Sequence, residues 1–315
     1  MRCLCCNKEI DDPSDYEREV CWHNKCIKKF FSTDMIPQLD CSEEELEELA
    51  NSTVNKGLTV PGVQKKLSLH LETVDHISRF TLVDYPTGYI LKPQSSEFQA
   101  LPEAEFLSMK LAEIAGIKTV PCALLLNNGR YFYITKRIDR IKGKMRAMED
   151  FCQLSYRPTA DKYKGSYEAC GKIIRKYSKN VGIDLSEFYY RVLFCFVTCN
   201  SDMHLKNFSL IEDKPASRSF GLSDAYDLLP VNVIMPEDTE QMALALNGKK
   251  RNLRKKDFKT LASSLEITEK TSEIFMKRLI KLESKFIEAI QTSLMPEEMK
   301  DSFAEQMKIR LQVLK

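Results

Sequence analysis

Four polar residues that could do chemistry lie together, between an apolar, aromatic run and a short β-type run. They are Asp202, His204, Lys206 and Asn207. A loop held by two rigid elements is a common position for catalytic groups. Asp202 and Asn207 are five residues apart, which suits an acid that faces a substrate hydroxyl and an amide that faces a metal, as phosphoryl transfer requires. The alternative is a polar turn in which Asn and Asp only cap the local backbone.

Two distant stretches favour phosphoryl transfer over a simple turn. Asp227, in the segment 223–230, could supply a second carboxylate to the metal. Lys92 ends the strand-like run 89–92, and a strand lysine that reaches nucleotide phosphates is a further part of a kinase. Lysine, acid, amide and second acid therefore occur in the order that a two-lobed kinase needs.

On these residues the chain resembles the HipA-like serine/threonine kinases, the toxin half of bacterial toxin–antitoxin pairs. The combination of a D-x-H-x-K-N loop with an E-D-F-C-Q motif is specific to that resemblance. The matching residues span roughly positions 57 to 260 and comprise 60–66, 90–92, 101–105, 136–140, 149–153, 200–207 and 226–229.

The resemblance implies an α+β, two-lobed protein-kinase-like fold. We expect a small, mixed, β-rich N-lobe with an ATP-covering loop at 36–140. A larger α-helical C-lobe with the catalytic loop would follow at 141–315, and a small Cys/His metal-binding module at 1–35 would precede both lobes. A chain of this length is long enough for two lobes.

The activity implied is transfer of the ATP γ-phosphate to a Ser or Thr of a protein target. Asp202 would orient and deprotonate the attacking hydroxyl, and Asn207 and Asp227 would hold Mg²⁺. Lys92 would bind α- and β-phosphate oxygens and could pair with Glu103 or Glu105 of the next helix. The family's targets include aminoacyl-tRNA synthetases, whose phosphorylation stops translation, so the chain would act as a growth-arresting toxin.

The nucleotide site is expected to draw on several segments. Thr59, just before the glycine loop, matches a self-phosphorylated hydroxyl of the family and is predicted to be an inhibitory autophosphorylation site. His204 could bind a metal or serve as a hydrogen-bonded brace, and Lys206 could steady the transferred phosphate or be a surface lysine. The residues expected to contact ATP besides Lys92 and Asp227 are Pro61, Gly62, Val63, Gln64, Lys65 and Lys66 of the loop, Lys136, Arg137 and Ile138 of the hinge, His204 and Tyr226.

The partners implied by the resemblance are a protein substrate and a HipB-like antitoxin with a DNA-binding helix-turn-helix. DNA contact would occur only through the antitoxin complex. Longer family members carry an additional N-terminal subdomain before the glycine loop. In this chain a separate small protein could supply it, or the Cys/His module could replace it.

Cysteines are concentrated at the N-terminus, where five of eleven lie within the first 26 residues. Cys3-x2-Cys6 together with His23-x2-Cys26 predicts a closed, structural Zn²⁺ site. Cys5 or Cys21 could replace His23 as the fourth ligand. The alternative is a set of free thiols in a frayed terminus.

Composition is typical of a globular protein, with 43% hydrophobic residues, 29% charged residues and a net charge of +2. This small charge indicates no general attraction to nucleic acid or membrane. There is no apolar run of the ~20 residues needed to span a membrane and no secretory signal. A cytoplasmic location is therefore expected, with thiols reduced. The basic run 249–256 favours a solvated loop, with a nucleic-acid patch as the alternative.

Periodicity and turn signals predict the remaining elements. A capping box at Ser42 and Glu45 favours a short acidic helix at 41–50. Asn127-Asn128-Gly129 indicates a hairpin turn, and Ser186 is the predicted cap of a buried helix. The expected strands are 67–81, 88–92, 120–126 and 131–135, and the other expected helices are 103–115, 149–154, 161–178, 185–199, 256–266, 269–292 and 296–314.

Two rival functions remain. The chain could be a small-molecule phosphotransferase of similar two-lobed design. It could also be a zinc-bearing interaction protein with a silent kinase fold, although a silent kinase would usually have lost one of Lys92, Asp202, Asn207 and Asp227.

Overall fold

The computed structural model describes residues 1–39, 66–74, 77–81, 88–141 and 144–315. The described chain forms two compact units. Unit 1 comprises Met1–Phe106 and Val120–Ile138, and unit 2 comprises Leu107–Thr119 and Asp139–Lys315. Several predicted features lie outside the described residues: the helix at 41–50, Thr59, and the loop residues Pro61, Gly62, Val63, Gln64 and Lys65.

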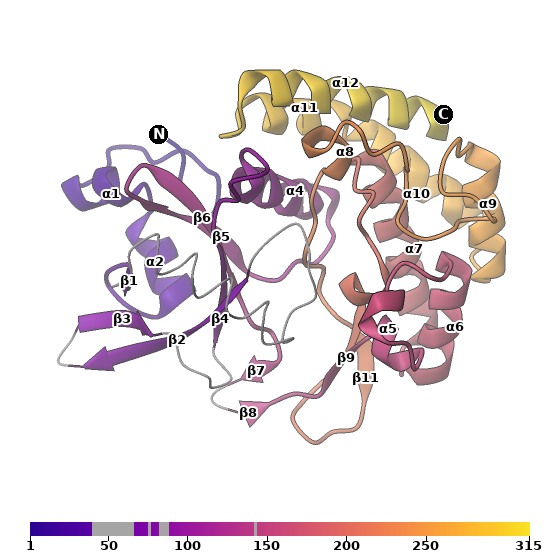
Figure 1. Cartoon of the computed structure of the whole chain (residues 1–315), viewed down its shortest axis with the longest axis horizontal. Helices are drawn as coiled ribbons and strands as arrows, with labels where there is room; N and C mark the ends of the chain where they lie inside the picture. The colour runs from indigo at the N-terminus through magenta and orange to yellow at the C-terminus, as the bar shows by residue number, and fades with distance from the viewer. Residues whose placement is uncertain (40–65, 75–76, 82–87, 142–143) are drawn as a thin grey trace. The chain divides into compact units, whose positions relative to one another are not determined.

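Unit 1 is built on a six-stranded sheet with the order β1-β3-β2-β4-β6-β5, in which only β1 and β3 pair in parallel (Figure 1). Its last hairpin turns at Asn128 and Gly129, both with positive φ, as the Asn-Gly signal predicted. The strands are β1 (Gln38–Leu39), β2 (Leu67–Val74), β3 (Ile77–Thr81), β4 (Tyr89–Lys92), β5 (Cys122–Asn127) and β6 (Arg130–Lys136).

Two short helices precede this sheet, α1 (Asp15–Val20) and α2 (Asn24–Phe31). Ser14 and Glu17 form a capping box that starts α1. Phe30 and Phe31 of α2 are buried against aromatic rings of the sheet. The N-terminal segment therefore shares the core of unit 1.

Helix α4 (Leu101–Ala115) follows β4. It begins two residues before the predicted start, with Pro102 in its first turn, where a missing N–H costs no hydrogen bond. Phe106, Leu107 and Leu111 are buried. Ile114 is 37% exposed, so the apolar face is narrower at the end of the helix.

Unit 2 is mainly helical, with a three-stranded sheet of order β11-β10-β9 and the two-stranded pair β7–β8. Helix α7 is almost wholly buried and lies at the centre of this core. Its strands and short 3₁₀ turns are β7 (Arg140–Ile141), β8 (Lys144–Met145), β9 (Met148–Asp150), η1 (Thr159–Asp161), η2 (Leu205–Asn207), β10 (Ser209–Glu212) and β11 (Phe220–Leu222). Its helices are α5 (Phe151–Leu154), α6 (Tyr167–Tyr177), α7 (Val181–Val197), α8 (Val231–Ile234), α9 (Lys255–Ser264), α10 (Glu269–Lys281), α11 (Glu283–Gln291) and α12 (Glu297–Leu314).

Three predicted helix starts in unit 2 are wrong. Residues 149–150 pair with β10 as part of a strand, and the helix starts only at Phe151. The helix expected from residue 161 starts at Tyr167, capped by Ser166. Ser186 does not cap α7, because the helix begins at Val181; its hydroxyl donates to the carbonyl of Gly182 inside the helix.

The long helix predicted at 269–292 is two helices, α10 and α11, which meet at Leu282. No Pro or Gly marks this break, so no local signal predicts it. Met276, Leu279 and Phe286 are buried, whereas Ile274 is 54% exposed.

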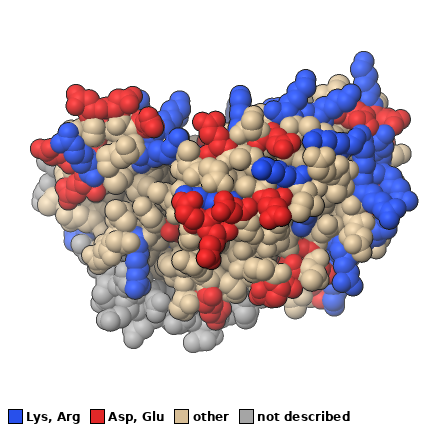
Figure 2. Space-filling view, turned by 90° about the horizontal axis from the view of Figure 1, so that it is seen from above, with Lys and Arg blue, Asp and Glu red and all other residues tan. Residues whose placement is uncertain are grey.

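Lys and Arg side chains gather at the right of Figure 2, on the side where α9 and α10 lie in Figure 1. Three lysines of the basic run make ion pairs: Lys249 with Asp257, Lys250 with Glu240, and Lys255 with Glu273, at 2.9–3.1 Å. Arg251, Arg254 and Lys256 are exposed, as a solvated loop predicts. None of the described helices is both long and apolar enough to cross a membrane.

Candidate functional site

Unit 1 contains a buried ion pair of predicted site residues. The ammonium of Lys92, at the end of β4, lies 2.6 Å from Oε1 of Glu105 on α4. Both side chains are almost fully buried. Two charges leave water only when geometry and hydrogen bonds compensate for the lost hydration, so this pair is held firmly. The sequence left open whether Glu103 or Glu105 pairs with Lys92, and in the structure the partner is Glu105.

Glu103 lies two residues before Glu105 on the same helix but has a different environment. Its Oε2 is buried and accepts no hydrogen bond from the described part of the chain. Burial raises the pKa of the Glu103 carboxyl above its ordinary value of 4.5, because the charged form is poorly solvated there.

This environment predicts that Glu103→Gln stabilises the protein near neutral pH. The carboxyl binds a proton more readily in the folded chain than in the unfolded one, so its ionisation lowers stability as the pH rises above 4.5. Thermal melts of both proteins across this range should show a higher Tm for the variant at neutral pH. The difference should vanish at acidic pH, where Glu103 is neutral. The control is Glu97→Gln, at an exposed glutamate. A difference in Tm between Glu103→Gln and wild type that does not change with pH would contradict the prediction.

The predicted hinge residues lie at the end of β6. The backbone N–H of Lys136 donates to the carbonyl of Pro121, and that of Arg137 donates to Gly88. The Lys136 ammonium lies over the rings of Phe30 and Tyr89, and burial lowers its pKa. Because these two N–H groups are engaged within the sheet, adenine recognition here would use carbonyl groups or Ile138. Lys66, the described end of the glycine loop, immediately precedes β2.

Unit 2 holds the catalytic loop between α7 and β10. The amide nitrogen of Asn207 donates to the carbonyl of Asp202 at 3.0 Å, and the Asp202 N–H donates to Oδ1 of Asn200 at 3.1 Å. The N–H of His204 also donates to the Asp202 carbonyl. These bonds fix the backbone at Asp202 while its side chain stays 37% exposed, as a group that must meet a substrate requires.

Two rings contact the Asp202 carboxylate. The hydroxyl of Tyr163 donates to Oδ1 at 2.5 Å, and Nε2 of His204 lies 4.0 Å from the same oxygen. The two rings meet edge to face. Burial and the neighbouring Asp202 raise the pKa of Tyr163 well above its ordinary range. His204 is buried beside the acid. The bond between Tyr163 and Asp202 joins residues 39 positions apart, and no sequence signal indicated it.

The remaining predicted residues surround the same loop. Lys206 donates to Oδ2 of Asp150 at 2.8 Å, so it has a carboxylate partner within unit 2. Tyr226 is bonded to the Ser209 hydroxyl and to the Lys206 carbonyl, and burial raises its pKa. Asp227 follows with a positive φ of 57°. Asn207 and Asp227 offer an amide oxygen and a carboxylate, the types of ligand that Mg²⁺ prefers.

A buried network supports this loop from α12. Nη2 of Arg310 donates to Oδ1 of Asn232 at 2.9 Å, and its guanidinium lies over the ring of Phe196. The amide nitrogen of Asn232 donates to the Ser201 hydroxyl, which donates to Oδ2 of Asp238 at 2.6 Å. Ser201 directly precedes Asp202, so α12 helps to fix the position of the acid. No sequence signal indicated this contribution.

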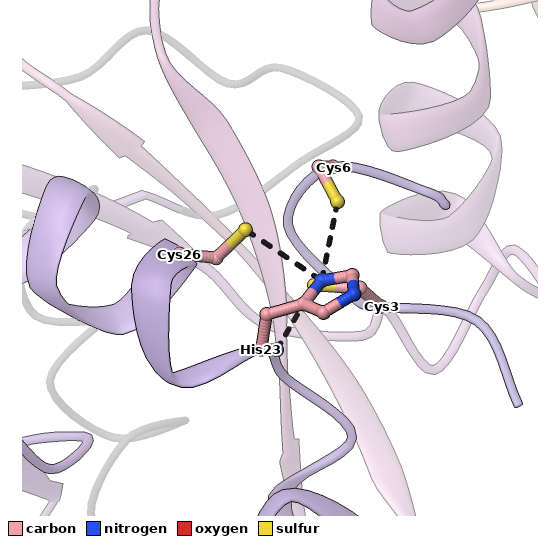
Figure 3. Close-up of side chains that lie close together, drawn as sticks. All are labelled: Cys3, Cys6, His23 and Cys26. Atoms are coloured by element: carbon pink, nitrogen blue, oxygen red, sulfur yellow. Dashed lines mark hydrogen bonds between the residues drawn. The ribbon is translucent and has the colours of Figure 1, made fainter. Parts of the chain in front are cut away.

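The N-terminal segment brings together Cys3, Cys6, His23 and Cys26, as the sequence spacing predicted (Figure 3). Their ligand atoms all lie within 4.8 Å of one another. Cys21, an alternative fourth ligand, instead directs its thiol to the carbonyl of Arg18. Burial raises the pKa of the Cys3 thiol, and burial with nearby thiols raises that of Cys26.

Residues 58–286 match the family described as HipA-like C-terminal domain. Among curated proteins, the chain is similar to two putative kinases of Sinorhizobium fredii. Y4mE is 30% identical, and the match covers 64% of this chain and 48% of Y4mE. Y4dM is 33% identical, and the match covers 58% of this chain and 47% of Y4dM. A putative kinase of Haemophilus influenzae is 26% identical, and the match covers 67% of this chain and 63% of the relative. The chain thus spans about half the length of the two Sinorhizobium relatives.

Two solved structures share the fold. HipA of Shewanella oneidensis, from a toxin–antitoxin complex with HipB and operator DNA, matches with a TM-score of 0.64 at 21% identity, over 80% of this chain and 63% of that one. The Helicobacter pylori proinflammatory kinase CtkA matches with a TM-score of 0.55 at 14% identity. This match covers 75% of this chain and 89% of CtkA. The prediction of an α+β, kinase-like fold with an N-terminal Cys/His cluster is thereby confirmed.

Proposed function

Because this chain belongs to the family of HipA-like C-terminal domains, we propose that it is an ATP-dependent kinase that phosphorylates Ser or Thr of a protein. The observation that supports this most is the buried pair of Lys92 and Glu105 at 2.6 Å. In protein kinases a strand lysine paired with a helix glutamate meets the nucleotide phosphates, and the pair must be in place for activity. A charged pair this deeply buried would otherwise be costly for the fold.

The catalytic loop supplies the groups for the transfer itself. In the proposed reaction Asp202 orients the substrate hydroxyl and accepts its proton, while the hydroxyl oxygen attacks the γ-phosphorus. Asn207 and Asp227 hold Mg²⁺, which neutralises charge on the phosphates when bound. ADP leaves as the bond to the γ-phosphate breaks. The fixed backbone of the loop keeps the acid in place without reorganisation.

The biological setting is proposed from the relatives. HipA of Shewanella oneidensis is seen in complex with HipB and operator DNA, which supports a HipB-like antitoxin partner here and contact with DNA only through it. We further propose a growth-arresting toxin of the cytoplasm with a protein target, such as an aminoacyl-tRNA synthetase. Autophosphorylation of Thr59 and cover of the ATP phosphates by the glycine loop stay predictions, as does a small separate protein in place of the additional subdomain.

The direct test is incubation of the full chain with Mg²⁺ and ATP labelled at the γ-phosphate, alone and with a cell lysate. A parallel reaction uses ATP labelled at the α-phosphate, which reports transfer of the nucleotide instead of the phosphate. We expect γ-label, but no α-label, in phosphoserine or phosphothreonine of a protein band. Label only in small molecules of the lysate would favour a small-molecule phosphotransferase. ATP binding without any transfer would favour the zinc-bearing scaffold, and either result would overturn the proposal.

A further inference from the structure

The nitrogen of His23 and two cysteine sulfurs at the N-terminus have the separations of a tetrahedral zinc site. Nδ1 of His23 lies 3.5 Å from Sγ of Cys6 and 3.8 Å from Sγ of Cys26 (Figure 3). With Zn–S near 2.3 Å and Zn–N near 2.0–2.1 Å, a sulfur and a nitrogen on two corners of a tetrahedron are about 3.6 Å apart. All four ligand atoms lie within 4.8 Å of one another, which is close enough for one ion to contact each of them.

The groups around the ligands are also those of a metal site. Nε2 of His23 lies 3.1 Å from the carbonyl of Glu9. A proton on Nε2 would be donated to this carbonyl, which leaves Nδ1 as the atom with a lone pair, and such a bond commonly orients metal-bound histidines. The backbone N–H of His23 donates to Sγ of Cys3 at 3.4 Å. The N–H of Asn7 donates to the carbonyl of Cys3 at 2.9 Å and closes the turn that contains Cys6.

We propose that Cys3, Cys6, His23 and Cys26 bind one Zn²⁺ as a closed structural site that attaches the N-terminal segment to the sheet of unit 1. All four ligands are protein groups, so no position is left for a substrate or a reactive water. The ligands come from two short stretches of chain, and a metal bound between such stretches supplies folding free energy. This site does not depend on the proposed kinase activity.

Residues next to the ligands form hydrogen bonds with one strand, β5. The carbonyl of Leu4 accepts from the N–H of Leu124 on β5 at 2.8 Å, and the indole of Trp22 donates to the Leu124 carbonyl at 3.0 Å. The N–H of Leu4 donates to the carbonyl of Cys21, which joins the two ligand stretches to each other. Holding Cys3 and His23 on one ion therefore holds both contacts with β5.

The same segment also packs on β4. The last metal ligand, Cys26, lies in α2, and the rings of Phe30 and Phe31 in that helix contact Tyr89 of β4. The Tyr89 hydroxyl donates to the carbonyl of Phe30 at 3.2 Å. Lys92 lies three residues after Tyr89 on the same strand. Loss of the metal is therefore expected to loosen the support of the strand that carries this lysine.

The test measures metal directly, in the full chain purified without added metal. Wild type should carry one equivalent of zinc by elemental analysis, and Cys6→Ser should carry almost none. Cys21→Ser is the matched control, since it removes a thiol from the same segment but leaves the four ligands intact; it should keep one equivalent. Chelation should lower the Tm of wild type and of the control, and leave that of Cys6→Ser unchanged, because only bound metal stabilises the folded state.

Cobalt gives an independent readout that does not require a folded variant. Wild type exchanged with Co²⁺ should show the intense visible bands of tetrahedral coordination and a thiolate-to-metal charge-transfer band. Wild type without zinc that takes up no Co²⁺, weak bands of octahedral coordination, or a full equivalent of zinc in Cys6→Ser would each overturn the proposal. A protein that binds zinc but transfers no phosphate would refute the kinase proposal and leave this site standing.

Discussion

Asp202→Asn is expected to reduce phosphoryl transfer by ~10²–10⁴-fold, the usual contribution of a general base. Asparagine has nearly the same shape, and its amide oxygen can still accept from the Tyr163 hydroxyl that now bonds the carboxylate. The backbone bonds of residue 202 to Asn200 and Asn207 do not involve the side chain. The fold should therefore persist while the group that takes the substrate proton is lost. Initial rates of γ-label transfer at saturating ATP measure the effect.

The matched control for this variant is Asp224→Asn. It makes the same chemical change in the segment that precedes Asp227, at a residue to which we assign no catalytic role. Its rate should stay close to that of wild type. ATP affinity, measured separately by equilibrium binding, should be similar in all three proteins. Equal losses of rate in both variants, or an Asp202→Asn protein as active as wild type, would remove Asp202 from the mechanism.

Glu105→Leu is expected to lower the free energy of unfolding by about 3–5 kcal/mol, the typical cost of removing one partner from a buried ion pair. The Lys92 ammonium would remain in a site where it is only 4% exposed, without its carboxylate. Urea unfolding followed by a spectroscopic probe gives this difference. ATP affinity should fall as well, because the lysine is no longer held in one position.

The double variant Lys92→Met/Glu105→Leu separates stability from function. Replacing both charges with apolar side chains of similar size removes the buried charge, and such exchanges are often neutral or stabilising. Its free energy of unfolding should return towards the wild-type value while ATP binding stays lost. A double variant that binds ATP normally would show that Lys92 has only a structural role. A double variant that is no more stable than Glu105→Leu would show that the unpaired Lys92 ammonium does not cause the loss of stability in Glu105→Leu.

Local chemistry in the sequence was enough for several features. The Asn128-Gly129 turn, the strand that ends at Lys92 and the buried helix before the catalytic loop all depend on neighbouring residues. The Cys/His cluster was also recognisable, because the two residues of each pair are separated by only two positions. Helix boundaries were less reliable: α7 begins at Val181 without a side-chain cap, so no local capping signal marks its start.

Features that depend on contacts between distant residues could not be predicted. Tyr163 and Asp202 are 39 residues apart, and either side chain could have pointed elsewhere. The choice of Glu105 over Glu103 depends on which face of α4 meets β4, and two acids two positions apart give no such information. Lys206 was expected to meet phosphate or solvent, but β9, which was itself predicted to be helical, places Asp150 next to it.

The support of the catalytic loop by α12 has a consequence for the timing of synthesis. Arg310 and its partner Asn232 are 78 residues apart, so at ~5–20 residues per second the ribosome adds Arg310 roughly 4–16 s after Asn232. During that interval Asp202 has been made, but the guanidinium that anchors Asn232 is missing. A nascent chain therefore passes through a period in which its sheet can form while its catalytic loop lacks one of its buried supports.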